Sequence, residues 1–343
     1  MANTYQLEEF LDPAVLDRIT ELRIHRPALI EAEARQRRKR NRLARDGKLV
    51  LVALDHPARG VTRVGDRKLA MGDRYELLAR ARRVLCDPNL DGFLAASDVV
   101  EDMLILSHLE RMATGKSFLD GRVVVGSMNR GGLSETVFEM DDTFTSFTAR
   151  RLAQLRCDGG KMLYRLERND PASLKTITAC AEALNALRRY KLPAFLEPLT
   201  VECRDGKYHP LNDITSIVRN CGIASALGES SSRVWLKLPY CKDFSRVCRA
   251  TTLPILLLGG PARDDPREVL SDFFQGLSSG ARVRGAIIGR NLLFPSDGDP
   301  LPMCRALTSL VHENASLDEA CRIRTQSPPR EPVVLVRDKR NRR

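Results

Sequence analysis

Long apolar runs, metal-ligand clusters and paired cysteines are all missing from this sequence of 343 residues. No stretch has the length of a membrane-spanning helix, and the first residues lack a basic segment followed by an apolar one, so we expect a cytoplasmic protein. The five histidines show no paired ligand spacing, which argues against a zinc site. The nine cysteines include no Cys-x-x-Cys pair, so we expect reduced thiols without disulfides.

Charge is plentiful but unevenly distributed. The net charge of +11 arises in residues 35–48, with eight Lys or Arg against one acid, and in residues 322–343, with eight against two. A protein that binds nucleic acid usually presents a basic face spread over its fold. We therefore interpret both runs as solvated surface segments or tails and expect no nucleic-acid partner.

Eight short apolar runs, each followed by a stretch with helical spacing, dominate the chain. They lie at residues 49–55, 92–96, 122–125, 161–164, 194–197, 234–238, 254–258 and 285–288. The first is a continuous apolar run, which is typical of a strand buried in a parallel sheet. The eightfold alternation predicts an α/β fold, a (β/α)8 TIM barrel. A doubly wound open sheet is the alternative, but no Gly-x-Gly-x-x-Gly follows the first strand.

The domain organisation predicted from these patterns has three parts. Residues 1–47 form an N-terminal helical extension, whose polar segment at 31–45 is expected to be a surface helix. Residues 48–320 form the barrel, and residues 321–343 form a basic tail.

The run 233–241 (Arg-Val-Trp-Leu-Lys-Leu-Pro-Tyr-Cys) places a lysine inside an apolar strand. Because side chains alternate along a strand, Trp235 and Lys237 share one face. A buried ammonium costs several kcal/mol unless it is paired or neutral, so an interior Lys237 indicates a functional role. The alternative is a lysine at a strand end whose amine reaches solvent.

Polar residues and glycines occur at the ends of the other predicted strands, where barrel enzymes carry their active sites. The candidates are Asp55, His56, Lys161, Glu197, Lys237, Gly259, Gly260, Gly289 and Arg290. Each also has a structural interpretation: Asp55 could cap a turn, Lys161 could lie at the exposed start of its strand, and Glu197 could pair with either lysine.

Together, these candidate residues suggest a chemistry that none of them suggests alone. Strands four and six can contribute to one barrel layer, so Lys161 and Lys237 can meet. Two close ammonium groups lower one another's pKa, and a neutral amine can attack a ketone to form a Schiff base. A neighbouring carboxylate or the second lysine would move the protons. The glycine turns after strands seven and eight, with Arg290, suit a phosphate.

Six segments resemble the motifs of class I aldolases. They are Leu-Asp-His-Pro-Ala-Arg-Gly (54–60), Lys-Met-Leu-Tyr (161–164), Phe-Leu-Glu-Pro-Leu (195–199), Trp-Leu-Lys-Leu-Pro (235–239), Leu-Leu-Gly-Gly (257–260) and Ile-Gly-Arg-Asn (288–291). The resemblance covers about residues 48–295 and is to the deoxyribose-phosphate, tagatose-bisphosphate and archaeal-type fructose-bisphosphate aldolases. The chain also resembles aldolase-like proteins associated with bacterial inositol catabolism.

This resemblance implies a metal-independent, cofactor-free lyase that acts on a phosphorylated keto sugar or keto-sugar acid. Lys237 would form the imine with Lys161 as its companion, and Glu197 would transfer protons. Asp55 would contact substrate hydroxyls, and the substrate and its phosphate would be bound by His56, Gly259, Gly260, Gly289 and Arg290. Two segments depart from the family pattern: the longer turn after Asp55, and the loop 126–142, which has no counterpart in the classical enzymes of the family.

Other functions are compatible with parts of this pattern. The main alternative is an aldolase-like regulatory protein that binds a sugar phosphate without turnover, and a zinc-dependent aldolase is a third option. The lysine pair with Glu197 favours the enzyme, because simple binding has no need for an amine of lowered pKa. The sequence leaves the aldehyde product and any homo-oligomer open.

Overall fold

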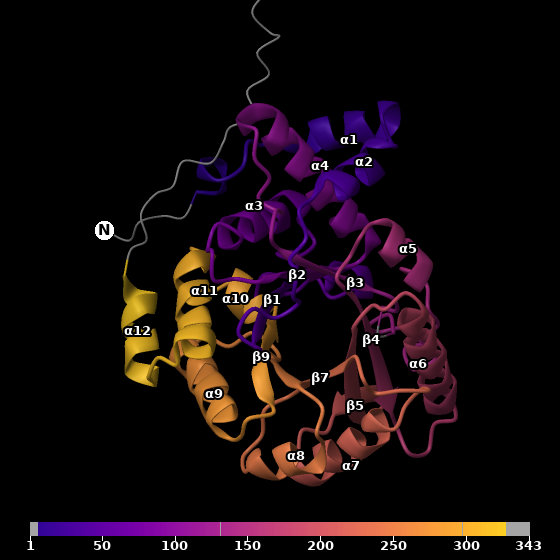
Figure 1. Cartoon of the computed structure of the whole chain (residues 1–343). Helices are drawn as coiled ribbons and strands as arrows, with labels where there is room; N and C mark the ends of the chain where they lie inside the picture. The colour runs from indigo at the N-terminus through magenta and orange to yellow at the C-terminus, as the bar shows by residue number, and fades with distance from the viewer. Residues whose placement is uncertain (1–5, 131, 297, 327–343) are drawn as a thin grey trace, which may run out of the picture.

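Eight parallel strands close into a barrel in the computed structural model, which describes residues 6–130, 132–296 and 298–326 (Figure 1). The barrel strands are β1 (Leu49–Ala53), β2 (Gly92–Ala95), β3 (Val123–Ser127), β4 (Gly159–Leu166), β5 (Ala194–Arg204), β7 (Val234–Leu238), β8 (Ile255–Leu258) and β9 (Val283–Ile288). Each pairs in parallel with the next, and β9 pairs with β1 to close the ring. The predicted TIM barrel is therefore confirmed.

Helices on the outside of the ring connect the strands. They are α3 (Arg74–Val84), α4 (Ser97–Thr114), α5 (Ala149–Gln154), α6 (Ala172–Arg189), α7 (Ile214–Ser225), α8 (Ser245–Ala250), α9 (Pro266–Ser278), α10 (Arg290–Leu293) and α11 (Pro300–Thr308), which continues as a π-helical turn, η3 (Ser309–Glu313). Side chains cap several of their first turns, because the first backbone N–H groups of a helix have no partner within it. Asp73, Asp213 and Asp265 accept such N–H groups at the starts of α3, α7 and α9.

Two further helices precede the barrel, as predicted. The chain begins with a short 3-10 turn, η1 (Leu7–Glu9), and then forms α1 (Val15–His25) and α2 (Leu29–Gln36). Both contact α4, and Figure 1 shows them grouped beside it. Ion pairs Arg23–Asp102 (2.9 Å) and Arg111–Glu33 (2.9 Å) attach these helices to α4.

The barrel has separate apolar layers on its two sides, as alternating side chains require. The outward-facing residues of the strands join the helices in one large core. The inward-facing residues form a second core inside the ring: Leu49, Leu51, Ala53, Leu94, Val123, Val125, Phe195, Leu256 and Ile287, with Leu43 and Trp235 packed against it. The interior of the ring is thus filled with side chains.

The basic run 35–48 lies differently from what the sequence suggested. Helix α2 ends at Gln36, and Arg37 is 1% exposed, so the predicted solvated helix to residue 45 is wrong. Its charges pair instead with carboxylates next to strand starts: Lys39 with Asp158 (3.1 Å) and Arg40 with Asp91 (2.7 Å). Because Leu43 from the same run packs on the inner core, this segment forms the floor of the barrel.

Some elements have no counterpart among the predicted ones. Strand β6 (Lys207–Pro210) pairs antiparallel with the extended end of β5 and forms a hairpin. Helix α12 (Leu317–Thr325) begins with a capping box at Ser316 and packs on α11 and α9. The predicted tail therefore begins within a helix, and its residues 327–343 lie outside the described part of the chain. Within the described ranges, no helix is long and apolar enough to cross a membrane.

Candidate active site

Four charged side chains from four barrel strands meet inside the ring. Lys161 comes from β4, Glu197 from β5 and Lys237 from β7, while Asp55 lies two residues after the end of β1. The strand register aligns Lys161 with Phe195, and Phe195 with Trp235. Lys161 therefore lies two residues deeper than Glu197, as its early position in the strand predicted. Lys161 is fully buried, and Lys237 is 7% exposed.

The four groups form a continuous chain of contacts. Lys237 Nζ donates to Glu197 Oε2 at 2.9 Å, and Lys161 Nζ lies 3.1 Å from the same oxygen. Lys161 also donates to Asp55 Oδ2 at 3.1 Å. One carboxylate oxygen thus bridges the two lysines, and the deeper lysine bridges the two carboxylates.

Their surroundings separate the pKa values of the two amines. Burial lowers the pKa of Lys237, and the charge of Lys161 lowers it further. Glu197 acts in the opposite direction but does not outweigh them, so the pKa of this amine is lowered. Burial acts in the same direction on Lys161, but Asp55 and Glu197 outweigh it and raise the pKa of that amine. The pair therefore divides into a persistent cation, Lys161, and an amine that loses its proton more easily, Lys237.

The two carboxyl groups are held ionised. Burial alone would raise both pKa values, but Lys161 and Lys237 hold the pKa of Glu197 down at about 2. Burial acts in the same way on Asp55, but Lys161, with a smaller effect from Lys237, keeps the pKa of Asp55 well below its ordinary range. Both groups can therefore accept protons or hydrogen bonds, and neither begins as a proton donor.

His56 lies beside Asp55 and is neutral. Its Nδ1 is 3.8 Å from Asp55 Oδ1, and burial lowers the pKa of the ring to about 3. The same Nδ1 is buried and has no hydrogen-bond partner among the described residues. A Cβ at Gly289 would lie 2.3 Å from the His56 ring, so glycine is required there for close packing.

Side chains that follow β9 donate hydrogen bonds to the turn that follows β8. Asn291 donates to the carbonyls of Gly259 (2.6 Å) and Pro261 (2.7 Å), and Arg290 Nη2 donates to the carbonyl of Gly260 at 3.2 Å. Gly260 has a φ of +65°, a conformation that favours glycine. The predicted glycine turn and Arg290 are thus in direct contact.

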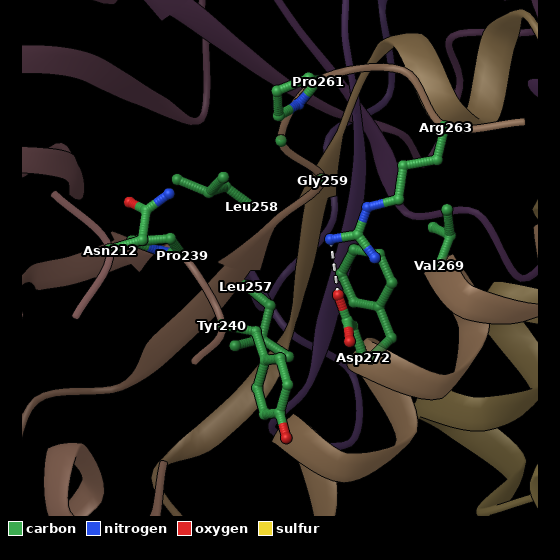
Figure 2. Close-up of a pocket in the computed structure, with 12 residues that line it drawn as sticks. Asn212, Pro239, Tyr240, Leu257, Leu258, Gly259, Pro261, Arg263, Val269 and Asp272 are labelled. Carbon is green, nitrogen blue, oxygen red and sulfur yellow. Dashed lines mark ion pairs between the residues drawn. The ribbon is translucent and has the colours of Figure 1, made fainter. Parts of the chain in front are cut away.

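A cavity of about 80 Å³ adjoins this turn, and Figure 2 shows the residues that line it. Its lining comes from the ends of β7 and β8 and from α9, with Gly259 and Gly260 at one wall. Arg263 crosses it to pair with Asp272 at 2.7 Å. The cavity adjoins the predicted phosphate turn, whereas the two lysines lie outside its lining.

Several residues near this cluster were not among the predicted site residues. Ser127, at the end of β3, donates to Asp55 Oδ2 at 3.2 Å. Arg165, at the end of β4, pairs with Glu139 of the loop 126–142 at 3.2 Å. Arg59 follows β1 within the segment 54–60. A charged residue just after a predicted strand was the only sequence signal for Arg59 and Arg165.

No group of three or more His, Cys, Asp or Glu side chains in the described ranges is arranged to hold a metal ion. The chemistry available to the described cluster is that of an amine with lowered pKa, an ammonium and two carboxylates. Such a set can form an imine with a carbonyl compound and move protons around it.

Comparison with known proteins identifies the family of this chain. Residues 47–306 match the model of the Cgl0159-like family. An uncharacterized aldolase from Saccharolobus solfataricus is 31% identical over 147 residues, which are 41% of this chain and 50% of that protein. This chain thus spans about half the length of that curated relative.

Solved structures share the fold. The structure of Cgl0159 from Corynebacterium glutamicum is 36% identical, with a TM-score of 0.83, over 90% of this chain and all of that one. An archaeal fructose 1,6-bisphosphate aldolase is 20% identical, with a TM-score of 0.57, over 83% of this chain and 99% of that one. At that identity the second likeness shows the fold alone. None of these relatives is named for inositol catabolism, so that association stays a prediction.

Proposed function

The chain belongs to the Cgl0159-like family, and from that membership and the geometry of the lysine cluster we propose that it is a class I aldolase. It would cleave a phosphorylated keto sugar or keto-sugar acid through an imine, without a metal. The observation that carries this proposal is the single Glu197 oxygen shared by a lysine of lowered pKa and a lysine of raised pKa.

Lys237 is the nucleophile in this mechanism. Its neutral amine attacks the substrate ketone, and the resulting carbinolamine loses water to give an imine. Glu197, 2.9 Å from Nζ, accepts the proton that the attacking amine gives up and returns it to the departing hydroxyl, and one further proton taken up from solvent gives water and the protonated imine. The protonated imine then draws the electrons of the neighbouring carbon–carbon bond, which releases the aldehyde and leaves an enamine.

Asp55 and Lys161 prepare this step. As an ionised acceptor, Asp55 can take a hydrogen bond or a proton from the substrate hydroxyl whose oxygen becomes the aldehyde. Lys161 keeps Asp55 and Glu197 ionised, and its own charge lowers the pKa of Lys237. Ser127 orients Asp55 through its hydrogen bond. Protonation of the enamine and hydrolysis of the imine complete the cycle.

The proposed phosphate site lies at the ends of β8 and β9. Arg290 supplies a guanidinium, and the turn at Gly259 and Gly260 supplies backbone next to it. His56 and Gly289 form the neighbouring wall, and the neutral ring leaves the positive charge to Arg290. A role in inositol or related carbohydrate catabolism, in the cytoplasm, remains a prediction from the resemblance stated above.

Borohydride trapping tests the proposal. The full-length protein is incubated with dihydroxyacetone phosphate, reduced, and mapped by peptide mass spectrometry. We expect a reduced adduct on Lys237, absent from Lys237→Met and present in the control Lys242→Met, which alters an exposed lysine five residues away.

Each other outcome has a definite meaning. An adduct on Lys161 would exchange the roles of the two lysines. Turnover of a ketose phosphate with no adduct on either lysine would end the Schiff-base proposal. Binding of sugar phosphates with neither adduct nor turnover would support the regulatory alternative.

A further inference from the structure

A larger cavity, of about 410 Å³, lies in a groove between α7 and α8. Figure 1 shows these two helices side by side outside the ring, one before and one after the strand that carries Lys237. The base of the groove is apolar, because Ile214, Val218 and Ala250 line it and pack against the outer core. The lining includes no residue of the lysine cluster and none of the turn at Gly259, so the groove is separate from the candidate active site.

Three arginines also line this groove: Arg219 from α7, and Arg246 and Arg249 from α8. All three are exposed, and in the described ranges none of their side chains forms an ion pair or a hydrogen bond. Asp213 and Asp243 precede the two helices, but no acidic side chain is part of the lining. The groove thus carries three positive charges around an apolar base, which is complementary to a partner with several anionic groups beside an apolar one.

The exposure of the groove favours a protein segment over a small molecule. A small-molecule site buries most of its ligand, whereas these three guanidiniums are open to solvent, where a single ion pair contributes little. A protein segment can cover all three together and exclude water from them. Nucleic acid is a poor match, because the lining has no aromatic side chain on which a base could stack.

Accessible surface continues along α7 beyond the cavity. Ile223 is 38% exposed and lies four residues after Arg219, on the same side of the helix. Gly222 lies four residues after Val218, and an added Cβ there would meet no atom within 4 Å. A partner segment longer than the cavity therefore has further apolar contact available to it.

We propose that the α7–α8 groove binds an acidic segment of a partner protein, which presents aspartate or glutamate side chains around an aliphatic one. The carboxylates pair with the three arginines, and the aliphatic side chain lies on the apolar base. This inference goes beyond the proposed function and does not depend on it, because the groove shares no residue with the candidate active site.

Equilibrium binding of a defined peptide to the full-length protein tests this proposal. The probe is a fluorescently labelled, amphipathic helical peptide of glutamate, leucine and alanine, and its control peptide has glutamine in place of glutamate. Fluorescence anisotropy at physiological ionic strength should show that the acidic peptide binds about 10-fold or more tightly than the neutral one. The triple variant Arg219→Gln/Arg246→Gln/Arg249→Gln should lose this preference.

A second variant and a matched control keep the test specific. Thr215 is an exposed lining residue in the first turn of α7, where a carboxylate is favourable, so Thr215→Glu adds an acid to the groove without removing a core contact. It should weaken binding of the acidic peptide. The control Arg18→Gln/Arg150→Gln/Arg189→Gln removes the same charge from exposed arginines outside the groove, and it should keep the wild-type preference. Circular dichroism checks that each variant is folded.

Other outcomes would overturn the proposal. Equal binding of the two peptides would show that the groove has no preference for acids, and equal weakening by the control variant would show attraction by net charge alone. Tripolyphosphate that binds as tightly as the acidic peptide, with the same dependence on the three arginines, would assign the groove to small anions. Self-association that disappears in the triple groove variant, measured by sedimentation, would make a second copy of this chain the occupant.

Discussion

Replacement of Lys161 by methionine tests whether the deeper lysine acts on its neighbour mainly through charge. Lys161 Nζ and Lys237 Nζ contact the same Glu197 oxygen at 3.1 and 2.9 Å, so they lie at most about 6 Å apart. At an effective dielectric constant of about 20, two unit charges at that distance repel by roughly 3 kcal/mol. This energy corresponds to about a 100-fold change in the neutral fraction of the nucleophile near neutral pH.

The sign of the effect follows from the pKa of Lys237. Lys161 lowers that pKa, so its removal raises it and leaves less neutral amine at a given pH. The same replacement removes the cation that lies between Asp55 and Glu197. The negative charges of these two carboxylates also raise the pKa of Lys237. Lys161→Met should therefore form the imine about 100-fold more slowly near pH 7, and the deficit should shrink as pH rises.

The assay is the rate of borohydride-trapped adduct formation with dihydroxyacetone phosphate, from about pH 6 to about pH 10. Because loss of one partner from a buried ion pair can cost about 3–5 kcal/mol, thermal unfolding must show that the variant is folded. The double variant Lys161→Met/Asp55→Asn removes a buried charge of each sign and serves as the charge-balanced control. A deficit of the same size at every pH would refute the electrostatic explanation and indicate that Lys161 transfers a proton itself.

Three further predictions concern the metal, the phosphate and stability. Turnover should survive EDTA, because an imine stabilises the carbanion without a metal; complete loss with recovery on added zinc would contradict the class I assignment. Arg290→Ala should weaken use of phosphorylated substrates by about 1.5–3 kcal/mol more than that of dephosphorylated analogues, and equal losses would show a structural role. His312 contacts Asp46 (2.8 Å) and Asp91 (3.0 Å); burial lowers its pKa, but these contacts outweigh burial and raise it above the ordinary 6.5. The stability that His312 contributes to the free energy of unfolding should be complete below about pH 6.5 and be lost as pH rises through its raised pKa. The free energies of unfolding of His312→Gln and the wild type, measured by chemical denaturation, should therefore converge at higher pH.

Local sequence pattern determined the barrel and most of the candidate cluster. Continuous apolar runs of strand length, separated by helical spacing, predicted all eight barrel strands, because burial on both faces leaves that signature. The face that carries Lys237 followed from alternation along its strand, and the greater depth of Lys161 followed from its early position after two glycines. These properties depend on near neighbours in the chain, which a sequence displays directly.

Tertiary structure alone decided which distant groups meet. The basic run 35–48 has the composition of a solvated segment, but its charges pair with carboxylates such as Asp91 and Asp158, far along the chain, and it forms the barrel floor. Likewise, no local pattern shows that one oxygen of Glu197 contacts both lysines, or that Arg59 lacks a carboxylate partner among the described residues. The physical reason is that pairing of charges depends on distances across the closed ring, and closure brings together residues that are separated by more than a hundred positions.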